Sequence, residues 1–411
     1  MKKSKLGEVL SISSMSVIPQ AGITYKLYSL PSFDDGQEPE TAGSETIQSN
    51  KYVVPTRCIL FNKLNVRFKR IWRINNNIPN KLCSTEFLPL VINEDLIDYQ
   101  YCYYLLASDY LTNYLCGINS NTSGSHKRIN PDILLSVDVA LPTLNEQKRI
   151  GSMLANLDRK IEINRAINHN LEAIAKQLYD YWFVQFDFPN TEGKPYKSSG
   201  GKMVWNEKLK REIPEEWHCG NLFEIATFTN GLACQKFRPK DGEVPLPVIK
   251  IREMHDGISS DTEEVSPNIP ESVKVYNGDV LFSWSASLEV MLWACGLGGL
   301  NQHIFKVTSS NDFPKSFYYF QLLNYVDVFK KMAEARKTTM GHITQDHLQQ
   351  STIAIPDNKD IVDKFEKRIS PIFAQMVKLQ EEIQQLSKQR DELLPLLMNG
   401  QASLNYDLAH D

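Results

Sequence analysis

Hydrophobic positions between Leu144 and Phe186 repeat at alternating steps of four and three residues. This spacing is the a/d seam of a left-handed coiled coil, and it predicts one long helix over residues 143–186. Thr143 and Glu146 have the spacing of a capping box at its start. The seam residues are Ile150, Leu154, Leu157, Ile161, Asn164, Asn168, Leu171, Ala175, Leu178 and Trp182.

Two consecutive positions in the middle of this seam are asparagines. A buried asparagine costs stability but can fix the register of a partner helix, so the seam is expected to fit one particular partner. An ordinary amphipathic core helix is the alternative interpretation. A repeat that continues over four heptads favours the coiled coil.

A second seam of the same phase lies 215 residues further along the chain. It predicts a second long helix over residues 357–400, which we expect to pair antiparallel with the first. Antiparallel helices would give the chain an approximate two-fold axis. The seam residues are Phe365, Ile369, Ile372, Met376, Leu379, Ile383, Leu386, Arg390, Leu393 and Leu397.

Similar segments recur outside the helices and indicate an internal duplication. Leu6–Ser11 matches Leu222–Ala226, and Cys58–Phe61 matches Asp279–Phe282. Short β-rich runs separated by Gly, Pro, Asn and Ser predict an α+β fold. We therefore expect a first domain over 1–142, a flexible linker over 187–213, a second domain over 214–356 and a tail over 401–411.

Composition is that of an ordinary globular protein. Of the 411 residues, 42% are hydrophobic and 23% are charged, and the formal net charge is −4. Met1-Lys-Lys is not followed by an apolar run of signal-peptide type, and the seven cysteines include no CxxC pair. These features predict a cytoplasmic protein without a metal site.

Motifs for catalysis are weak. There is no Walker A loop, HExxH, GxSxG or glycine-rich dinucleotide fingerprint. Ile129–Asp132 falls short of an adenine methyltransferase motif. Pro131-Asp132 with Glu146-Gln-Lys148 fits a loose nuclease pattern, but Glu146 is already expected in the helix cap. His342 and His347 are interpreted as surface residues rather than metal ligands.

Basic residues gather in one segment of the first half. In 66–74, alternation on a candidate strand would place Arg67, Lys69 and Arg73 on one face, with Phe68 and Trp72 on the other. Such a strand could hold its cations along DNA phosphates. A charged edge strand that resists aggregation is the open alternative. The candidate DNA-binding residues of this segment are Lys63, Arg67, Lys69, Arg70 and Arg73.

Two further loops occupy corresponding places in the halves and combine small hydroxyl residues, glycine and cations. This composition suits contacts to phosphates and base edges. A simple turn before the next strand is the alternative for both. The candidate residues are Ser125, Lys127 and Arg128 in the first loop, and Arg336, Lys337, Thr338, Thr339 and His342 in the second.

The aromatic run Tyr179, Tyr181, Trp182, Phe183 and Phe186 ends the first predicted helix. It could form a docking surface for another subunit. It could equally be the foot of the helix packing on the second domain. The sequence leaves both open.

Three sets of segments carry a resemblance to one known family. The first is Leu141-Pro-Thr-Leu-Asn-Glu-Gln-Lys-Arg-Ile150, followed by a long helix that ends in Tyr181-Trp-Phe183. The second is Phe188-Pro-Asn190 with Gly193–Lys202 and Ile213–Trp217, and the third is Gly278–Ser285 with Leu300–Lys306. In that order they resemble the central conserved region, the linker and one class of target recognition domain of the specificity subunits of type I restriction-modification enzymes.

The resemblance implies that each domain reads one half of a bipartite DNA sequence and that the helices set the spacing. It implies double-stranded DNA, two modification subunits and motor-nuclease restriction subunits as partners, and no membrane. The chain itself would be non-catalytic and bind no cofactor, with S-adenosylmethionine, ATP and Mg²⁺ used by the partners. Ile355-Pro-Asp-Asn-Lys departs from the family's usual helix opening. A coiled-coil scaffold joining two protein-binding domains is the alternative function.

Overall fold

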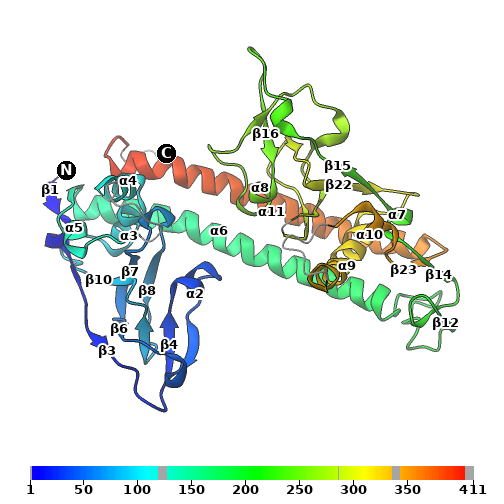
Figure 1. Ribbon diagram of the computed structural model, residues 1–411, viewed down its shortest axis with the longest axis horizontal. Coiled ribbons are helices and arrows are strands. Elements are labelled where there is room, and N and C mark those ends of the chain that lie inside the picture. The colour runs from blue at the N-terminus through cyan, green and yellow to red at the C-terminus, as the bar shows by residue number, and fades with distance from the viewer. Residues whose placement is uncertain (1, 119–126, 286, 336–342, 403–411) are drawn as a thin grey trace, which may run out of the picture. The chain divides into compact units, whose positions relative to one another are not determined.

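The computed structural model describes residues 2–118, 127–285, 287–335 and 343–402. The chain divides into two compact units. The first unit comprises residues 1–160 and 386–411, and the second comprises residues 161–385. The long helices α6 (Leu144–Tyr179) and α11 (Asp360–Met398) contribute residues to both units (Figure 1).

The first unit is built on two sheets. An antiparallel sheet has the strand order β2-β10-β7-β8, a five-stranded sheet has the order β3-β6-β9-β4-β5, and β1 pairs with β11. The strands are β1 (Lys2–Lys5), β2 (Leu10–Ile12), β3 (Ser16–Val17), β4 (Thr24–Tyr28), β5 (Glu40–Gly43), β6 (Lys51–Val53), β7 (Arg57–Asn62), β8 (Ile71–Asn75), β9 (Lys81–Cys83), β10 (Phe87–Ile92) and β11 (Asp138–Leu141).

Short helices complete this unit. They are α1 (Leu6–Val9), α2 (Leu30–Asp34), η1 (Ser44–Thr46), η2 (Val66–Phe68), α3 (Tyr99–Ala107), α4 (Asp109–Ile118) and α5 (Pro131–Leu135). The tyrosine-rich helices α3 and α4 are separated at Ser108, whose backbone is extended. One face of α3, with Tyr101, Cys102 and Leu105, lies in a core that also contains Leu397 and Met398 of α11.

The second unit repeats this plan. Its strands are β12 (Met203–Asn206), β13 (Arg211–Pro214), β14 (Trp217–Gly220), β15 (Ala226–Asn230), β16 (Leu246–Ile249), β17 (Glu264–Val265), β18 (Lys274–Val275), β19 (Val280–Ser283), β20 (Glu289–Leu292), β21 (Gly298–Leu300), β22 (Ile304–Ser309) and β23 (Ile353–Pro356). Its shorter helices are α7 (Leu222–Ile225), η5 (Cys234–Lys236), α8 (Ile251–Asp256), η6 (Glu271–Val273), α9 (Lys315–Ala335) and α10 (Gln345–Gln349).

Sheet topology supports the predicted duplication. The order β15-β22-β19-β20 in the second unit corresponds strand by strand to β2-β10-β7-β8 in the first, and β14-β23 corresponds to β1-β11. The matched segments Cys58–Phe61 and Asp279–Phe282 lie at the corresponding strands β7 and β19. The mixed helix and strand content and the two repeats expected from the sequence are therefore confirmed.

The predicted long helices form close to their predicted limits. Thr143 N donates to Glu146 Oε2 at 2.9 Å, and Glu146 N is 3.4 Å from Thr143 Oγ1, so the capping box is formed. The pKa of the Glu146 carboxyl is lowered by the hydrogen bonds that it accepts from the Thr143 hydroxyl, at 2.8 Å, and from the Thr143 N–H. All the seam residues of both helices are buried or half-buried. Packing of the apolar stripe is what holds helices of this length in place.

Inside the second unit, the polar seam residues contact the other helix. Asn164 Nδ2 donates to Glu382 Oε2 at 2.8 Å, and Asn168 Nδ2 donates to the Met376 carbonyl oxygen at 3.2 Å. Residue numbers fall on α11 as they rise on α6, so the two helical segments run antiparallel within this unit. The structure thus supplies the polar partners that buried amides need.

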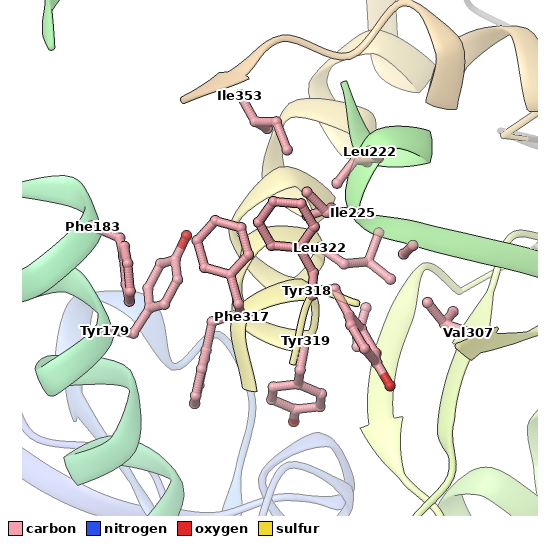
Figure 2. Packing of buried hydrophobic residues seen from close by; sticks show 14 of the residues in the cluster. Tyr179, Phe183, Leu222, Ile225, Val307, Phe317, Tyr318, Tyr319, Leu322 and Ile353 are labelled. Carbon is pink, nitrogen blue, oxygen red and sulfur yellow. The ribbon is translucent and has the colours of Figure 1, made fainter. Parts of the chain in front are cut away.

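The aromatic run at the end of α6 packs into the core of the second unit. α6 passes into a π-helix, Asp180–Val184, and Tyr179, Trp182, Phe183 and Phe186 are at most 3% exposed. Phe183 contacts Phe317 and Phe365 with ring centroids 5.1 and 5.0 Å apart. Figure 2 shows Tyr179 and Phe183 facing the aromatic residues of α9. Of the two interpretations left open, the foot of the helix is the correct one for these four residues.

The segment expected as a flexible linker, 187–213, is instead ordered against the second unit. β12 and β13 form an antiparallel hairpin, and Phe188 stacks on Trp217 with centroids 5.6 Å apart. Phe188 and Ile213 are buried. The glycine and serine content suggested a flexible segment. The free energy gained by burying Phe188 and Ile213 outweighs the conformational entropy lost when the segment is ordered.

Arg390, the one charged seam residue, has a specific partner within the first unit. Its Nη1 lies 2.9 Å from Asp158 Oδ1, and Tyr104 Oη donates to Asp158 Oδ2 at 2.5 Å. Burial, together with that hydrogen bond to the carboxylate, raises the pKa of Tyr104. Asp158 therefore links α3, α6 and α11 through one carboxylate.

We predict that Asp158→Ala lowers the free energy of unfolding by about 1–3 kcal/mol. The buried Tyr104 phenol loses its acceptor, and the half-buried Arg390 guanidinium loses one of its two carboxylate partners, the other being Asp391. Replacing both partners, in Asp158→Leu with Arg390→Met, should restore much of the loss. Urea denaturation of the single and double variants measures this coupling. Lys388→Ala, at an exposed pair with Glu392, is the control and should change stability by less than about 0.5 kcal/mol. Additive losses would contradict a specific pair.

Candidate nucleic-acid interface

The basic segment of the first unit forms a loop at the end of the four-stranded sheet. β7 ends at Asn62 and β8 begins at Ile71, and between them η2 is flanked by Asn65 and Lys69, both in the left-handed conformation with φ of 52° and 47°. The predicted strand over 66–74 is therefore wrong for its first half. Two left-handed residues break extended pairing there, and only Arg73 of the three aligned cations lies on β8.

Side-chain positions in this loop also differ from the prediction. Trp72 is buried as expected, but Phe68 is 52% exposed. The Arg67 and Arg70 guanidinium carbons lie 4.7 and 4.9 Å from the centre of the Phe68 ring. Val66 is buried and anchors the turn. The loop thus presents an aromatic ring with two cations at its tip, an arrangement suited to phosphates and base edges.

The second predicted segment of this domain lies beside the first. Asn65 N donates to the Lys127 carbonyl oxygen at 2.8 Å, and Ile129 N donates to the Lys63 carbonyl oxygen at 3.0 Å. Leu64 and Arg128 form an isolated β-bridge. The fold therefore brings the cations of the two segments together at one edge. They are Lys63, Arg67, Lys69, Arg70, Lys127 and Arg128. Ser125 lies outside the described residues.

Three of these cations are held by acids. Lys69 lies 2.5 Å from Asp109, Arg70 lies 2.7 Å from Asp34, and Arg128 binds Glu86 through both Nε and Nη2. The hydrogen bonds to Asp34 and Glu86 raise the pKa of Arg70 and of Arg128. Acid partners of this kind orient guanidinium groups.

Arg67 and Arg73 differ from the cations of this edge that are bound to acids. Arg67 is exposed, and within the described part of the chain neither Arg67 nor Lys63 has a carboxylate partner. Arg73 faces inward, where its Nη1 donates to Gln100 at 3.0 Å and its guanidinium covers the Tyr103 ring at 4.4 Å. The structure therefore favours Arg67 as a ligand contact and Arg73 as a structural residue.

The second predicted loop, with Arg336, Lys337, Thr338, Thr339 and His342, lies outside the described residues. Ile343, which follows it, donates its N–H to the Trp284 carbonyl oxygen at 3.0 Å. His347 is 9% exposed, and its Nδ1 accepts from Thr344 N at 3.0 Å at the start of α10. The expectation of a surface histidine is wrong at this position, because capping of α10 buries the ring.

The weak catalytic motifs have structural uses. Asn130 Oδ1 accepts from Asp132 N at 3.0 Å and caps α5, as Glu146 caps α6.

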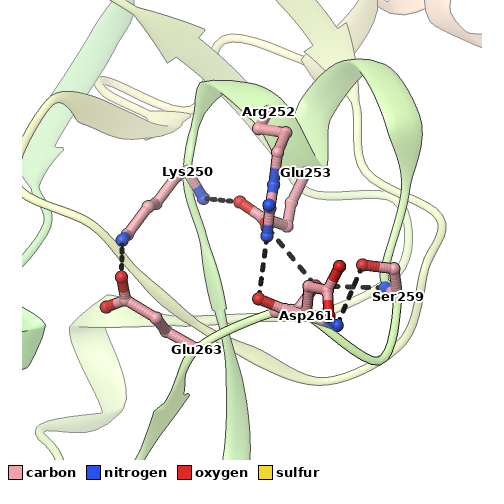
Figure 3. Close-up of polar contacts among 7 residues, drawn as sticks. Lys250, Arg252, Glu253, Ser259, Asp261 and Glu263 are labelled. Carbon is pink, nitrogen blue, oxygen red and sulfur yellow. Dashed lines mark hydrogen bonds and ion pairs between the residues drawn. The ribbon is translucent and has the colours of Figure 1, made fainter. Parts of the chain in front are cut away.

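In the second unit, Lys250 pairs with Glu263, and Arg252 pairs with Glu253 and the Asp261 carbonyl (Figure 3). No group of three His, Cys, Asp or Glu side chains placed to hold a metal occurs among the described residues. Nor is any helix in that part of the chain long and apolar enough to cross a membrane.

Comparisons with known proteins identify the class. The family model described as "Type I restriction modification DNA specificity domain" matches residues 1–173 and again residues 214–389. The chain therefore belongs to the family of type I restriction-modification DNA specificity domains, and carries two copies of the domain.

Individual relatives agree with this assignment. The type I restriction enzyme MjaIX specificity subunit of Methanocaldococcus jannaschii is 24% identical over 78% of this chain and 73% of its own length. The HindI specificity subunit of Haemophilus influenzae is 22% identical over 84% of this chain and 86% of its own length. A crystal structure of a type I restriction-modification S subunit from M. genitalium covers 98% of this chain and 96% of its own, with a TM-score of 0.57 at 13% identity, and shares the fold.

We predict that Arg67→Ala weakens DNA binding and reduces the slope of log K against log salt concentration by about one, since one phosphate contact is lost. Fluorescence anisotropy with duplex DNA over a range of salt concentrations measures the slope. Arg73→Ala serves as the control: it should lower the melting temperature while the slope stays unchanged. A slope unaffected by Arg67→Ala would return this loop to a purely structural role.

Proposed function

We propose that this chain is the DNA sequence-recognition subunit of a type I restriction-modification complex, with each half reading one part of a bipartite target. The observation that carries this proposal is the repeated domain. Each copy of the family domain places a loop at the same end of the same four-stranded sheet. In the first copy that loop presents Arg67 and Phe68 to solvent. Two such domains in one chain suit two separated half-sites on one duplex.

The two long helices are proposed to act as a spacer. Hydrogen bonds of Asn164 and Asn168 within the second unit, and of Asp158 with Arg390 within the first, support antiparallel pairing. We propose that the pairing continues along the helices as a coiled coil, with an approximate two-fold axis relating the halves. The 33 residues from Ile150 to Trp182 correspond to about 50 Å of helix, more than the roughly 34 Å of one DNA turn.

Methyl transfer and cleavage are assigned to partner subunits in this proposal. Asn130 and Glu146, the residues that gave the chain its faint likeness to a methyltransferase or nuclease, are engaged in helix caps. S-adenosylmethionine would then be used by modification subunits, and ATP and Mg²⁺ by motor-nuclease subunits. The specificity chain supplies binding and geometry.

Helix α6 and the π-helix Asp180–Val184 that continues it carry a surface suited to a modification subunit. Ile163, Ile167, Ile174, Tyr181 and Val184 are between 38% and 55% exposed, and follow one another at steps of 4, 7, 7 and 3 residues. We name these five residues the α6 stripe. Steps of this kind keep the side chains on one face of a helix. Exposed apolar stripes of this length mark protein interfaces.

The proposed function predicts that the purified chain leaves DNA chemically unchanged in the presence of S-adenosylmethionine, ATP and Mg²⁺, yet binds duplex DNA with an affinity that falls steeply with salt. Addition of modification subunits should produce adenine methylation at a sequence of two separated parts, mapped by sequencing genomic DNA. Salt-independent or absent DNA binding would favour the protein scaffold instead. Methylation by the chain alone would refute its non-catalytic role.

We predict that Ile167→Glu with Ile174→Glu weakens binding of the modification subunit by at least about 30-fold, because buried apolar anchors dominate such interfaces. DNA binding by the isolated chain should persist. Ala166→Glu with Ala173→Glu adds the same charges at exposed positions one residue earlier and is the matched control. Isothermal titration with the modification subunit compares the pairs. Equal affinities for both pairs would exclude the α6 stripe as the docking surface.

A further inference from the structure

The two domains share the geometry of one sheet end, although the chemistry there differs. In the second unit, β15 ends at Asn230, β19 ends at Ser283, β20 begins at Glu289 and β22 begins at Ile304. Because these antiparallel strands have the order β15-β22-β19-β20, all four of these ends meet at one edge. It corresponds to the edge of the first unit where Lys63 to Arg70 lie.

Backbone hydrogen bonds establish which residues correspond. Lys63 N donates to the Glu86 carbonyl oxygen at 2.9 Å, and Trp284 N donates to the His303 carbonyl oxygen at 3.3 Å. Ile129 N reaches Lys63 as Ile343 N reaches Trp284, both at 3.0 Å. Trp284 therefore occupies the place of Lys63, and His303 occupies the place of Glu86.

A buried polar residue ends the equivalent strand in both units and shapes the loop that follows. Asn62 Nδ2 donates to the Leu64 carbonyl oxygen at 2.6 Å, while Ser283 Oγ accepts from Glu289 N at 3.1 Å. Asn62 is 2% exposed and Ser283 is not exposed. In both units a buried side chain thus hydrogen-bonds to the backbone of the loop and fixes its conformation, as expected of a surface that presents residues to a ligand.

Among the described residues at this edge of the second unit are several neutral polar and aromatic side chains, beside the carboxylate of Glu289. Trp284 Nε1 donates to Asn230 Oδ1 at 3.2 Å, and the Trp284 and His303 rings are 5.5 Å apart. A tight turn, closed by the hydrogen bond from Ile304 N to the Asn301 carbonyl oxygen, carries Gln302 and His303 at its tip. The buried His303 Nδ1 has no hydrogen-bond partner within the described part of the chain. The other ring nitrogen, His303 Nε2, lies 3.3 Å from Gln302 Nε2, so the two side chains at the tip of the turn contact each other.

We propose that Gln302 and His303 read base edges in the second half-site of duplex DNA, with Trp284 supporting them. This inference rests on the proposed function and adds how the second domain performs it. A glutamine amide can pair with both N6 and N7 of adenine, and an imidazole can donate to or accept from a base. Among the described residues at the corresponding edges, the first domain presents Arg67 to phosphates, whereas the second presents Gln302 and His303 to bases.

The test uses the whole chain assembled with its modification subunits. Sequencing of methylated genomic DNA defines the two half-sites of the wild type. Duplexes with single base changes then report discrimination at each position for Gln302→Ala, Gln302→Glu and His303→Ala. We expect discrimination to fall by about 10- to 100-fold at one or two positions of one half-site, the cost of a lost base contact. The other half-site, which Arg67→Ala weakens, should be read as before.

Controls and failures are separable. Gln375→Ala and His218→Ala remove the same side-chain types from exposed sites elsewhere in the unit and should leave discrimination intact. Gln302→Glu keeps the shape of the side chain, and circular dichroism checks the fold of each variant. Unchanged discrimination in folded variants, or a uniform loss of affinity with a smaller salt slope, would overturn the inference. A wild-type complex that methylates no bipartite sequence would instead overturn the proposed function.

Discussion

The burial of two apolar helix seams is the constraint on which the rest of this structure depends. Neither core is complete without residues from both long helices. Leu393, Leu397 and Met398 of α11 pack with the core of the first unit, and Ala175, Tyr179 and Trp182 of α6 lie in the core of the second. Folding of each recognition domain is therefore tied to helical residues that the other half of the sequence supplies. A helix exposed along such a stripe would not be stable alone.

Polar residues in the seam give this packing its specificity. An apolar stripe alone tolerates several registers of the paired helix. Asn164, Asn168 and Arg390 each require a polar partner at a fixed position along the other helix. Glu382, the Met376 carbonyl group and Asp158 provide those partners. Asn168 Oδ1 stays without a hydrogen bond among the described residues, which fits the stability cost expected of such positions. Register is what would fix the distance between two DNA-reading surfaces.

Duplication explains how one fold can hold two unlike surfaces. Sheet order, the strand-ending polar residue and the backbone hydrogen bonds around Lys63 and Trp284 are repeated. The side chains placed on this frame are not repeated: among the described residues, cations with acid partners lie at one edge, whereas Trp284, Gln302 and His303 lie at the other. A backbone frame that is independent of the side chains at its rim allows each loop to vary without loss of the core.

Sequence alone determined the features that depend on local periodicity. The seams of 3.5-residue period predicted α6 and α11, and the spacing of Thr143 and Glu146 predicted the cap of α6, because helices and caps are set by neighbours within a turn. Repeated segments predicted the two domains. The tertiary structure decided the rest. Left-handed Asn65 and Lys69 turned a predicted strand into an exposed arginine–phenylalanine loop, since alternation of residues cannot report a backbone dihedral angle.

Long-range packing accounts for the remaining differences. Phe188 and Ile213 ordered a segment whose glycines suggested flexibility, because contacts with Trp217 and its neighbours are invisible in the composition. Trp284 and His303 lie 19 positions apart in the sequence, and Trp284 and Ile343 lie 59 apart. The antiparallel pairing of β19 and β22 brings Trp284 and His303 to one edge, and the hydrogen bond from Ile343 N to the Trp284 carbonyl oxygen adds the third residue. The sequence determined which elements form, and the tertiary structure decided which side chains meet, since strand pairing joins residues that share no local pattern.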